Sequence, residues 1–424
     1  MIVVKGGVTA PKGFLASGVK AGIKRSGRAD LALLYSEVPA VAAAAFTTNR
    51  FQASPIKVSR IHLKNKEHQA IIVNSGNANC ANGRIGDRDA LKMTEFIGKA
   101  LLLDNREVLV ASTGIIGVYL PLEKIEKAVP ELIEGLSGTK GACFAGAIMT
   151  TDTMKKELAV KVKLGKAAVT IGGACKGVGM IYPDMKTEGH PSASLRIVPS
   201  KRKRVEGHAT MLCFISTDAA ITKRMLGASL DEAIGGSFNM ISVDGDMSTN
   251  DSCFIIANGL AENREINDKG GDYRKFTKAL KFVTGELAKQ LARDGEGATK
   301  FIEISVTGAK SELDAKAIAR KISTSNLLKC AVCGEDPNWG RIVAAAGSSG
   351  VSFDPDKVDL YLGSLKALSN GMSVKGLDKD KAHKLFTKRD VYIKVDLKSG
   401  LHKATAWTCD FSREYVAINS KYST

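Results

Sequence analysis

The chain has 424 residues, of which 44% are hydrophobic and 25% charged, so it is long enough for about two or three domains of a globular protein. No apolar run approaches the roughly 18 residues of a membrane span, and the first residues lack the pattern of a signal peptide. The formal net charge of +17 does not by itself indicate nucleic acid, because most lysines are dispersed as on a solvated surface.

Strand-like and helix-like patterns alternate irregularly along the chain. Short apolar runs predict buried strands, and apolar residues at three- and four-residue steps predict amphipathic helices. In chain order, the predicted elements are strand 69–76, helix 121–136, strands 166–173 and 210–216, helix 275–293, and strands 299–308 and 390–397. Because the order follows no strict βαβ rhythm, we predict a layered α/β or α+β fold.

The cysteines and histidines do not point to a metal enzyme. Eight cysteines are spread thinly, and only Cys330 and Cys333 have metal-like spacing. Neither a second CxxC pair nor an HExxH motif accompanies them. We therefore expect reduced thiols, no metal and a cytoplasmic location.

Polar clusters rich in glycine follow many of the apolar runs. They lie at 74–83, 111–117, 148–153, 176–185, 242–251, 294–300 and 333–341. Each alone is compatible with an ordinary turn, but together they predict loops that converge on an active site at the edge of a sheet. None of them is a nucleotide-binding loop or a GxSxG elbow, so a Ser-His-Asp hydrolase has no motif to support it.

Thr210 opens the predicted strand 210–216 just after the most basic stretch, KRKR at 201–204. A β-branched residue is ordinary in a strand. A threonine at a chain terminus could instead act as a nucleophile, because its own amine can serve as the base. That second interpretation requires cleavage before Thr210. The residues alone do not decide between the two interpretations.

The motifs KGVGMIYPDM at 176–185 and ATMLCFISTDAAIT at 209–222 resemble the signature of the glutamate N-acetyltransferase family, also called ornithine acetyltransferases. The resemblance runs from VTAPKGFLASGVKAGIK and FTTNRFQASP, through SVDGDMSTND and DGEGATKF, to EYVAINSKYST at the C-terminus. Only residues 186–208 find no counterpart. It implies an α/β layered sandwich of the ornithine acetyltransferase type, similar to N-terminal-nucleophile enzymes.

The resemblance also implies roles for individual residues. Self-cleavage between Ala209 and Thr210 would give an α chain of residues 1–209 and a β chain of residues 210–424 that begins with the nucleophile. Thr113 and Gly114 would form the oxyanion hole. The residues implied to contact substrate are Thr150, Lys176, Thr210, Glu296, Asn419 and Thr424. Lys176 would pair with an α-carboxylate, and Glu296 would meet a substrate ammonium.

The implied reaction is ping-pong transfer of the acetyl group from N2-acetylornithine to glutamate through an acetyl-Thr210 ester, in arginine biosynthesis. No cofactor is implied, and the resemblance leaves acetyl-CoA open as a second acetyl donor. The implied partners are the two small-molecule substrates and the α and β chains of one precursor, assembled as α2β2. Neither a membrane nor nucleic acid is expected as a partner.

Three other interpretations stay open. The chain could be an N-terminal-nucleophile amidohydrolase or aminopeptidase, which would hydrolyse its substrate without glutamate. It could be an uncleaved, inactive precursor. It could also bind nucleic acid through residues 201–204, in which case binding would depend steeply on salt.

Residues 186–208 interrupt the family motif and create two candidates for the nucleophile. Thr187 keeps the family's spacing from Lys176, whereas Thr210 keeps everything downstream. A strand behind Thr210 would hold it in place, while the sequence after Thr187 is typical of a loop. We therefore predict Thr210 as the nucleophile and residues 186–208 as an inserted basic loop.

Overall fold

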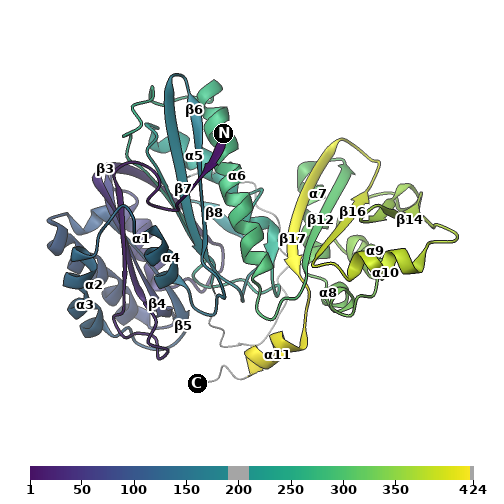
Figure 1. Cartoon of the computed structure of the whole chain (residues 1–424), viewed down its shortest axis with the longest axis horizontal. Coiled ribbons are helices and arrows are strands. Elements are labelled where there is room, and N and C mark those ends of the chain that lie inside the picture. Colours follow the sequence, from purple (N-terminus) through teal and green to yellow (C-terminus); the bar gives the residue numbers. More distant parts are fainter. Residues whose placement is uncertain (190–209, 421–424) are drawn as a thin grey trace. The chain divides into compact units, whose positions relative to one another are not determined.

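The computed structural model describes residues 1–189 and 210–420, which form two compact units (Figure 1). Within the described residues, unit 1 comprises 1–189, 210–235 and 247–287, and unit 2 comprises 236–246 and 288–420. Each unit has its own β-sheet. In the part of the chain that the structure describes, every helix is too short or too polar to span a membrane.

Unit 1 contains a ten-stranded sheet with the order β1-β6-β7-β9-β11-β3-β4-β5, and β2 and β8 also pair with β3. The strands are β1 (Ile2–Val4), β2 (Phe14–Val19), β3 (Leu31–Thr47), β4 (His68–Asn77), β5 (Val108–Ile115), β6 (Lys156–Leu164), β7 (Ala167–Lys176), β8 (Met185–Thr187), β9 (Leu212–Thr217) and β11 (Ser252–Ala257). The first part of the long strand β3 pairs with β2 and β4, and its second part pairs with β8 and β11. β3 therefore belongs to both halves of the sheet.

The helices of unit 1 flank this sheet. They are α1 (Ser54–His62), α2 (Gly83–Leu101), α3 (Leu122–Glu134), α4 (Gly141–Ile148), α5 (Lys223–Ile234) and most of α6 (Gly271–Arg293), with a short 3-10 turn η1 (Asn105–Glu107). The predicted apolar face of α6, which comprises Phe276, Leu280, Val283, Leu287 and Leu291, is fully buried.

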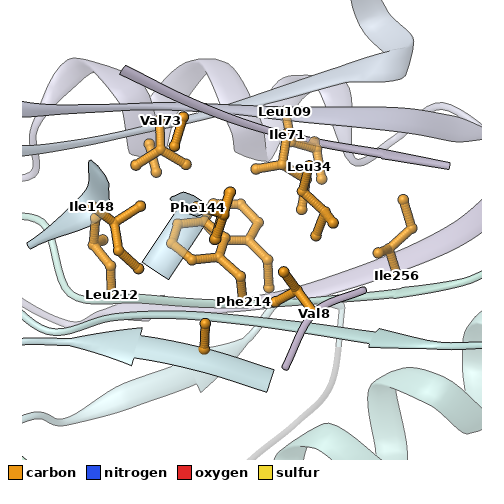
Figure 2. Packing of buried hydrophobic residues seen from close by; sticks show 14 of the residues in the cluster. Val8, Leu34, Ile71, Val73, Leu109, Phe144, Ile148, Leu212, Phe214 and Ile256 are labelled. Carbon is orange, nitrogen blue, oxygen red and sulfur yellow. The ribbon is translucent and has the colours of Figure 1, made fainter. Parts of the chain in front are cut away.

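The two halves of the sheet share one apolar core, which Figure 2 shows. Ile71 of β4 and Leu109 of β5 lie on one side, and Phe214 of β9 and Ile256 of β11 lie on the other. Phe144 of α4 lies between them and meets Phe214 edge-on, with ring centroids 5.2 Å apart. Each large apolar side chain buried here contributes about 1.5–3 kcal/mol to stability.

Helices cover the outer faces of the two halves. Met93 of α2 and Ile125 of α3 pack in one apolar cluster with Ile72 of β4. On the opposite side, Leu287 of α6 approaches Gly173 of β7. The result is an α–β–β–α sandwich, which confirms the predicted layered α/β fold.

Unit 2 contains a seven-stranded sheet with the order β10-β17-β12-β16-β13-β14-β15. The strands are β10 (Ile241–Ser242), β12 (Phe301–Ala309), β13 (Asp359–Leu362), β14 (Leu365–Ser369), β15 (Met372–Ser373), β16 (Asp390–Asp396) and β17 (His402–Cys409). The helices are α7 (Glu312–Ser323), α8 (Asn326–Cys333), α9 (Trp339–Gly347), α10 (Lys379–Phe386) and α11 (Arg413–Ser420), with 3-10 turns η2 (Phe238–Met240) and η3 (Pro355–Lys357). β12 pairs with β17 antiparallel and with β16 in parallel.

The predicted strands and helices are all present, with ends displaced by a few residues. The predicted inserted loop 186–208 is wrong at its start, because Lys186 and Thr187 pair with Phe46 and Ala45 as part of β8. The second part of β3 continues past its pairing with β4. Its backbone N–H and C=O groups on that edge therefore need other partners, and β8 provides them. Residues 190–208 of the predicted loop lie outside the described residues.

The predicted α and β chains do not coincide with the two compact units. β9 and β11 both follow position 210, yet they lie in the middle of the sheet of unit 1. β9 pairs with β7 on one side, from Leu212–Lys176 to Thr217–Ile171, and with β11 on the other. β11 in turn pairs with β3. The two chains would therefore contribute neighbouring strands to one sheet.

We expect cleavage between residues 209 and 210 to leave the native particle intact, because separating the chains would break the β7–β9 and β3–β11 ladders and expose the core between them. Size-exclusion chromatography with light scattering should give one mass in buffer, and a denaturing gel should give two chains. A free chain of residues 1–209 in buffer would contradict this expectation.

Candidate active site

Thr210 lies two residues before β9, the strand that anchors it. Its side chain is buried, and its Oγ1 lies 2.7 Å from the Oγ of Ser248, with either hydroxyl able to donate. The next residue, Met211, donates its backbone N–H to Oδ1 of Asp251 at 2.9 Å. The hydroxyl and the following peptide of Thr210 are thus both held by the segment that leads into β11.

One ammonium group joins three threonines from different parts of unit 1. Lys176, the last residue of β7, is fully buried. Its Nζ donates to Thr150 Oγ1 at 2.7 Å, to the carbonyl oxygen of Thr210 at 3.1 Å and to Thr113 Oγ1 at 3.2 Å. Because the Thr113 and Thr150 hydroxyls accept from Lys176, the hydrogen of each stays available for another acceptor.

A buried carboxylate partly balances the lysines beside it. Oδ1 of Asp152 lies 2.7 Å from Lys156 Nζ, and Oδ2 lies 4.0 Å from Lys176 Nζ. Burial by itself raises the pKa of Asp152, but the ammonium groups of Lys176 and Lys156 outweigh burial and lower this pKa to about 2. Asp152 thus offsets part of the positive charge of Lys156 and Lys176 close to Thr210.

Two glycines allow backbone segments to approach one another closely at this site. Gly114, in β5, has φ +135°, and a Cβ there would lie 2.2 Å from the carbonyl carbon of Gly76. Gly177, with φ +138°, faces Thr210, whose carbonyl oxygen would be 2.8 Å from a Cβ. A larger residue at either position would displace the strand ends that carry Thr113 and Lys176.

The segment 248–251 is tied to the neighbouring strand end. Asn250 donates its backbone N–H to Ser248 Oγ at 3.1 Å. Its side-chain amide donates to the carbonyl oxygens of Ala78 at 2.8 Å and Ser112 at 2.9 Å. The carbonyl of Ser248 accepts a hydrogen bond from Thr47 at 2.9 Å. These bonds fix the position of the Ser248 hydroxyl against Thr210.

Two predicted substrate residues meet in unit 2. Asn419, on α11, donates from Nδ2 to Oε2 of Glu296 at 3.0 Å. Glu296 is buried and precedes a loop that is held by backbone N–H bonds from Thr299 and Lys300 to Asp410. The roles of Glu296 and Asn419 toward substrate stay predictions.

In unit 1 the structure brings Thr113, Thr150, Lys176 and Thr210 together, with Gly114 next to Thr113 on β5. The polar clusters that contain Thr113, Thr150 and Lys176 therefore converge, as expected. Their catalytic and binding roles stay predictions. Ala209 and Thr424, as well as the basic stretch 201–204, lie outside the described residues.

The sequence did not single out Asp152, Lys156 or Ser248. Asp152 lies within the polar cluster 148–153 and Ser248 within 242–251, so a signal existed for the segments. It did not distinguish these side chains from their polar neighbours, because each could equally belong to a turn.

The structure separates the two candidate nucleophiles. Thr187 lies in β8, and its buried hydroxyl has no hydrogen-bond partner among residues 1–189 and 210–420. Thr210 instead contacts both Ser248 and Lys176. This geometry favours Thr210.

Known proteins are similar to this chain over nearly its whole length. Residues 15–424 match the ArgJ family. A relative from Caldanaerobacter subterraneus subsp. tengcongensis, named arginine biosynthesis bifunctional protein ArgJ, is 44% identical over 428 residues that cover 100% of both chains. A protein of the same name from Dehalococcoides mccartyi is 46% identical and covers 100% of this chain and 98% of its own.

Solved structures also match parts of the chain. The crystal structure of arginine biosynthesis bifunctional protein ArgJ from Bacillus halodurans is 40% identical, covers 49% of this chain and 97% of its own, and has a TM-score of 0.47. Ornithine acetyltransferase complexed with ornithine, from Mycobacterium tuberculosis, is 38% identical, covers 43% of this chain and 98% of its own, and has a TM-score of 0.41.

Proposed function

The chain belongs to the ArgJ family of arginine-biosynthesis acetyltransferases, and on that basis we propose that it moves the acetyl group of N2-acetylornithine to glutamate by way of Thr210. The observation that carries this proposal is the cluster around Thr210. Its hydroxyl lies 2.7 Å from Ser248, and Lys176 joins its carbonyl oxygen to the hydroxyls of Thr113 and Thr150. A nucleophile beside hydroxyl donors on anchored strand ends suits acyl transfer.

The first proposed step is self-cleavage. Oγ1 of Thr210 attacks the carbonyl carbon of Ala209, the peptide C–N bond breaks, and the amine of Thr210 takes up a proton. Water then hydrolyses the ester, which leaves a carboxylate on Ala209 and restores the Thr210 hydroxyl. The product is a β chain whose first residue carries both the nucleophile and an amine that can act as its base.

The second proposed step is acetyl transfer. The neutral Thr210 amine accepts the hydroxyl proton as Oγ1 attacks the acetyl carbonyl carbon. The oxyanion forms against Thr113 and Gly114, and ornithine leaves after its nitrogen is protonated. The amine of glutamate then attacks the acetyl-Thr210 ester, so that N-acetylglutamate forms and the hydroxyl of Thr210 is restored.

Lys176 has two consequences for this chemistry. Its hydrogen bond to Thr113 orients that hydroxyl so that the hydrogen can face the oxyanion. Its ammonium also lies 3.1 Å from the carbonyl oxygen of Thr210. A buried cation this close disfavours a second positive charge on the freed Thr210 amine, and a base requires the neutral form.

The assembly, the location and the use of cofactors belong to the same proposal. The α and β chains assemble as α2β2, and the enzyme is cytoplasmic, since its reaction belongs to amino-acid biosynthesis. Acetyl-CoA stays open as a second acetyl donor to glutamate. No other cofactor is required, because the threonine ester itself carries the acetyl group.

Incubating the cleaved protein with N2-acetylornithine tests the proposed function. We expect many turnovers of ornithine with glutamate present, together with an equal amount of N-acetylglutamate. Without glutamate we expect a burst of about one ornithine per Thr210 and then a slow phase, because only water can accept the acetyl group. Mass spectrometry of both products measures this.

Equal steady-state rates with and without glutamate would contradict the proposal and indicate an amidohydrolase. The uncleaved Thr210→Ala protein is the matched control, because it retains the rest of the cluster around position 210.

A further inference from the structure

Ser248 contacts the reacting oxygen of the proposed mechanism, yet none of the steps above uses it. Its Oγ lies 2.7 Å from Oγ1 of Thr210. Lys176 donates to the carbonyl oxygen of Thr210 rather than to this hydroxyl. Within residues 1–189 and 210–420, no side-chain carboxylate, imidazole or amine is hydrogen-bonded to Thr210 Oγ1. The oxygen that must give up its proton therefore meets another hydroxyl instead of a general base.

The proton of the Thr210 hydroxyl has the same destination in both proposed steps. It arrives on the nitrogen of Thr210 itself, which is the free amine during acetyl transfer and the leaving nitrogen during self-cleavage. This nitrogen and Oγ1 are bonded to neighbouring carbons, so a direct hydrogen bond between them closes a small ring and is strongly bent. Hydrogen bonds weaken steeply when the angle at the hydrogen falls below about 120°. A third group between the two atoms opens the ring and allows straighter bonds.

The hydrogen-bond capacity of Ser248 suits it to this place. Its Oγ accepts the backbone N–H of Asn250 at 3.1 Å, which takes one of its two lone pairs. In the contact with Thr210 either hydroxyl can donate. When Thr210 donates, it fills the second lone pair of Ser248, and the hydrogen of Ser248 is available to another acceptor. A group that accepts one proton while giving up another can act as a relay.

Both hydroxyls are held in place and away from bulk water. Ser248 is fully buried and Thr210 is nearly so. The carbonyl oxygen of Ser248 accepts from Thr47 Oγ1 at 2.9 Å, and the backbone N–H of Met211 donates to Asp251 at 2.9 Å. Because these bonds fix the two residues independently of substrate, the relay requires no ordering at the moment of reaction. Burial also restricts the access of water that could carry the proton instead.

We propose that Ser248 is a further catalytic residue, which relays the proton of the Thr210 hydroxyl to the nitrogen of the same residue. This inference rests on the proposed function, and it supplies the proton path that both of its steps require.

The relay balances in each step. During acetylation, Oγ1 of Thr210 bonds to the acetyl carbon, its proton moves to Ser248 Oγ, and the hydrogen of Ser248 moves to the neutral Thr210 amine. During self-cleavage, the same two transfers carry the proton to the Thr210 nitrogen as its bond to the carbonyl carbon of Ala209 breaks. Ser248 is a neutral hydroxyl before and after each step.

Replacing Ser248 by alanine tests the relay in the full-length chain. We expect self-cleavage to slow about 10²-fold, which is the lower end of what a positioned acid–base group contributes. After prolonged incubation, the cleaved fraction should acetylate Thr210 from N2-acetylornithine about 10²-fold more slowly in single turnover. The dissociation constant of N2-acetylornithine should be unchanged, because Ser248 acts on the proton of Oγ1 and does not hold substrate. Ser248→Thr keeps the hydroxyl and should restore most of both rates.

A proton inventory distinguishes the relay from a purely structural contact. In mixtures of H2O and D2O, wild-type acetylation rates should fall along a curve that lies below the straight line between the pure solvents, because two protons move in the step. Ser248→Ala should give a straight line, as expected for one proton in direct transfer. A straight line for the wild type would overturn the proposal. An equally curved dependence for Ser248→Ala would also overturn it, because water would then carry the proton.

Ser252→Ala is the matched control for these measurements. Ser252 is buried in β11, and its hydroxyl donates to the carbonyl oxygen of Asn250 at 2.8 Å. Its loss should leave both rates and the isotope dependence unchanged. If Ser248→Ala does not fold, Ser248→Cys occupies a similar space with a weaker donor and acceptor, and it should show the same slowing.

The outcomes distinguish this inference from the proposed function. Rates for Ser248→Ala within about threefold of the Ser252→Ala control are far smaller effects than a relay produces and would overturn the role of Ser248. A loss confined to the affinity for N2-acetylornithine would overturn it as well. A wild-type enzyme that forms no acetyl-enzyme from N2-acetylornithine would instead overturn the proposed function.

Discussion

Replacing Thr210 by alanine is expected to leave one uncleaved chain of 424 residues with no measurable acetyl transfer. The substitution removes the oxygen that attacks both Ala209 and the acetyl group. The proposed mechanism uses no other nucleophile. In a serine hydrolase, loss of the nucleophile lowers kcat by about 10⁶-fold. A denaturing gel measures cleavage, and ornithine release measures transfer.

Two variants make this test specific. Thr210→Ser retains a hydroxyl and should retain some cleavage, whereas Thr187→Val removes the competing hydroxyl and should cleave normally. N-terminal sequencing of the smaller product should read Thr-Met-Leu-Cys. Cleavage of Thr210→Ala, or a product that begins at Thr187, would show that the nucleophile has been assigned wrongly.

Replacing Thr113 by valine is expected to lower the rate of acetylation of Thr210 by about 10²–10³-fold, which is typical for the loss of one oxyanion donor. Valine keeps the branched shape in β5 and removes only the hydroxyl that accepts from Lys176. Because this donor acts mainly on the developing negative charge, kcat should fall while KM changes little. Single-turnover kinetics with N2-acetylornithine separate the two quantities.

Thr94→Val is a suitable control for this substitution. Thr94 is buried in α2 and donates its hydroxyl to the carbonyl oxygen of Leu91, so its loss should affect stability but not the acetylation rate. A Thr113→Val enzyme that acetylates within about threefold of the control would exclude the Thr113 hydroxyl from the oxyanion hole.

The elements that could be predicted from sequence are those whose burial pattern is local. In α6, five apolar residues recur at helical steps, and the structure buries all of them. Short apolar runs likewise coincide with the strands β4, β7, β9, β12 and β16. In both cases the residues that must leave water are neighbours in the chain, so their spacing predicts the element without knowledge of its partners.

The middle of β3 could not be predicted in this way. Residues 39–45 read PAVAAAA, and alanine has no preference for strands. The strand exists because β11 pairs with it from Val41 to Phe46 and the small side chains fit between the two halves of the sheet. β8 is a strand for a related reason, since its pairing with β3 outweighs the loop-like sequence that follows.

The sequence by itself determined the segments that are predicted to carry the chemistry: Thr210 at the start of a predicted strand, Thr113 with Gly114, and the polar cluster that begins at Lys176. Their residue types and order were sufficient for the family resemblance, which the comparisons confirmed. Only the tertiary structure decided which groups touch. The Lys176 ammonium contacts hydroxyls or carbonyls at 113, 150 and 210, and Ser248 meets Thr210 across 38 residues. Hydrogen bonds and charges act over a few ångströms of space, and strand pairing brings those positions together from distances along the chain that no local pattern records.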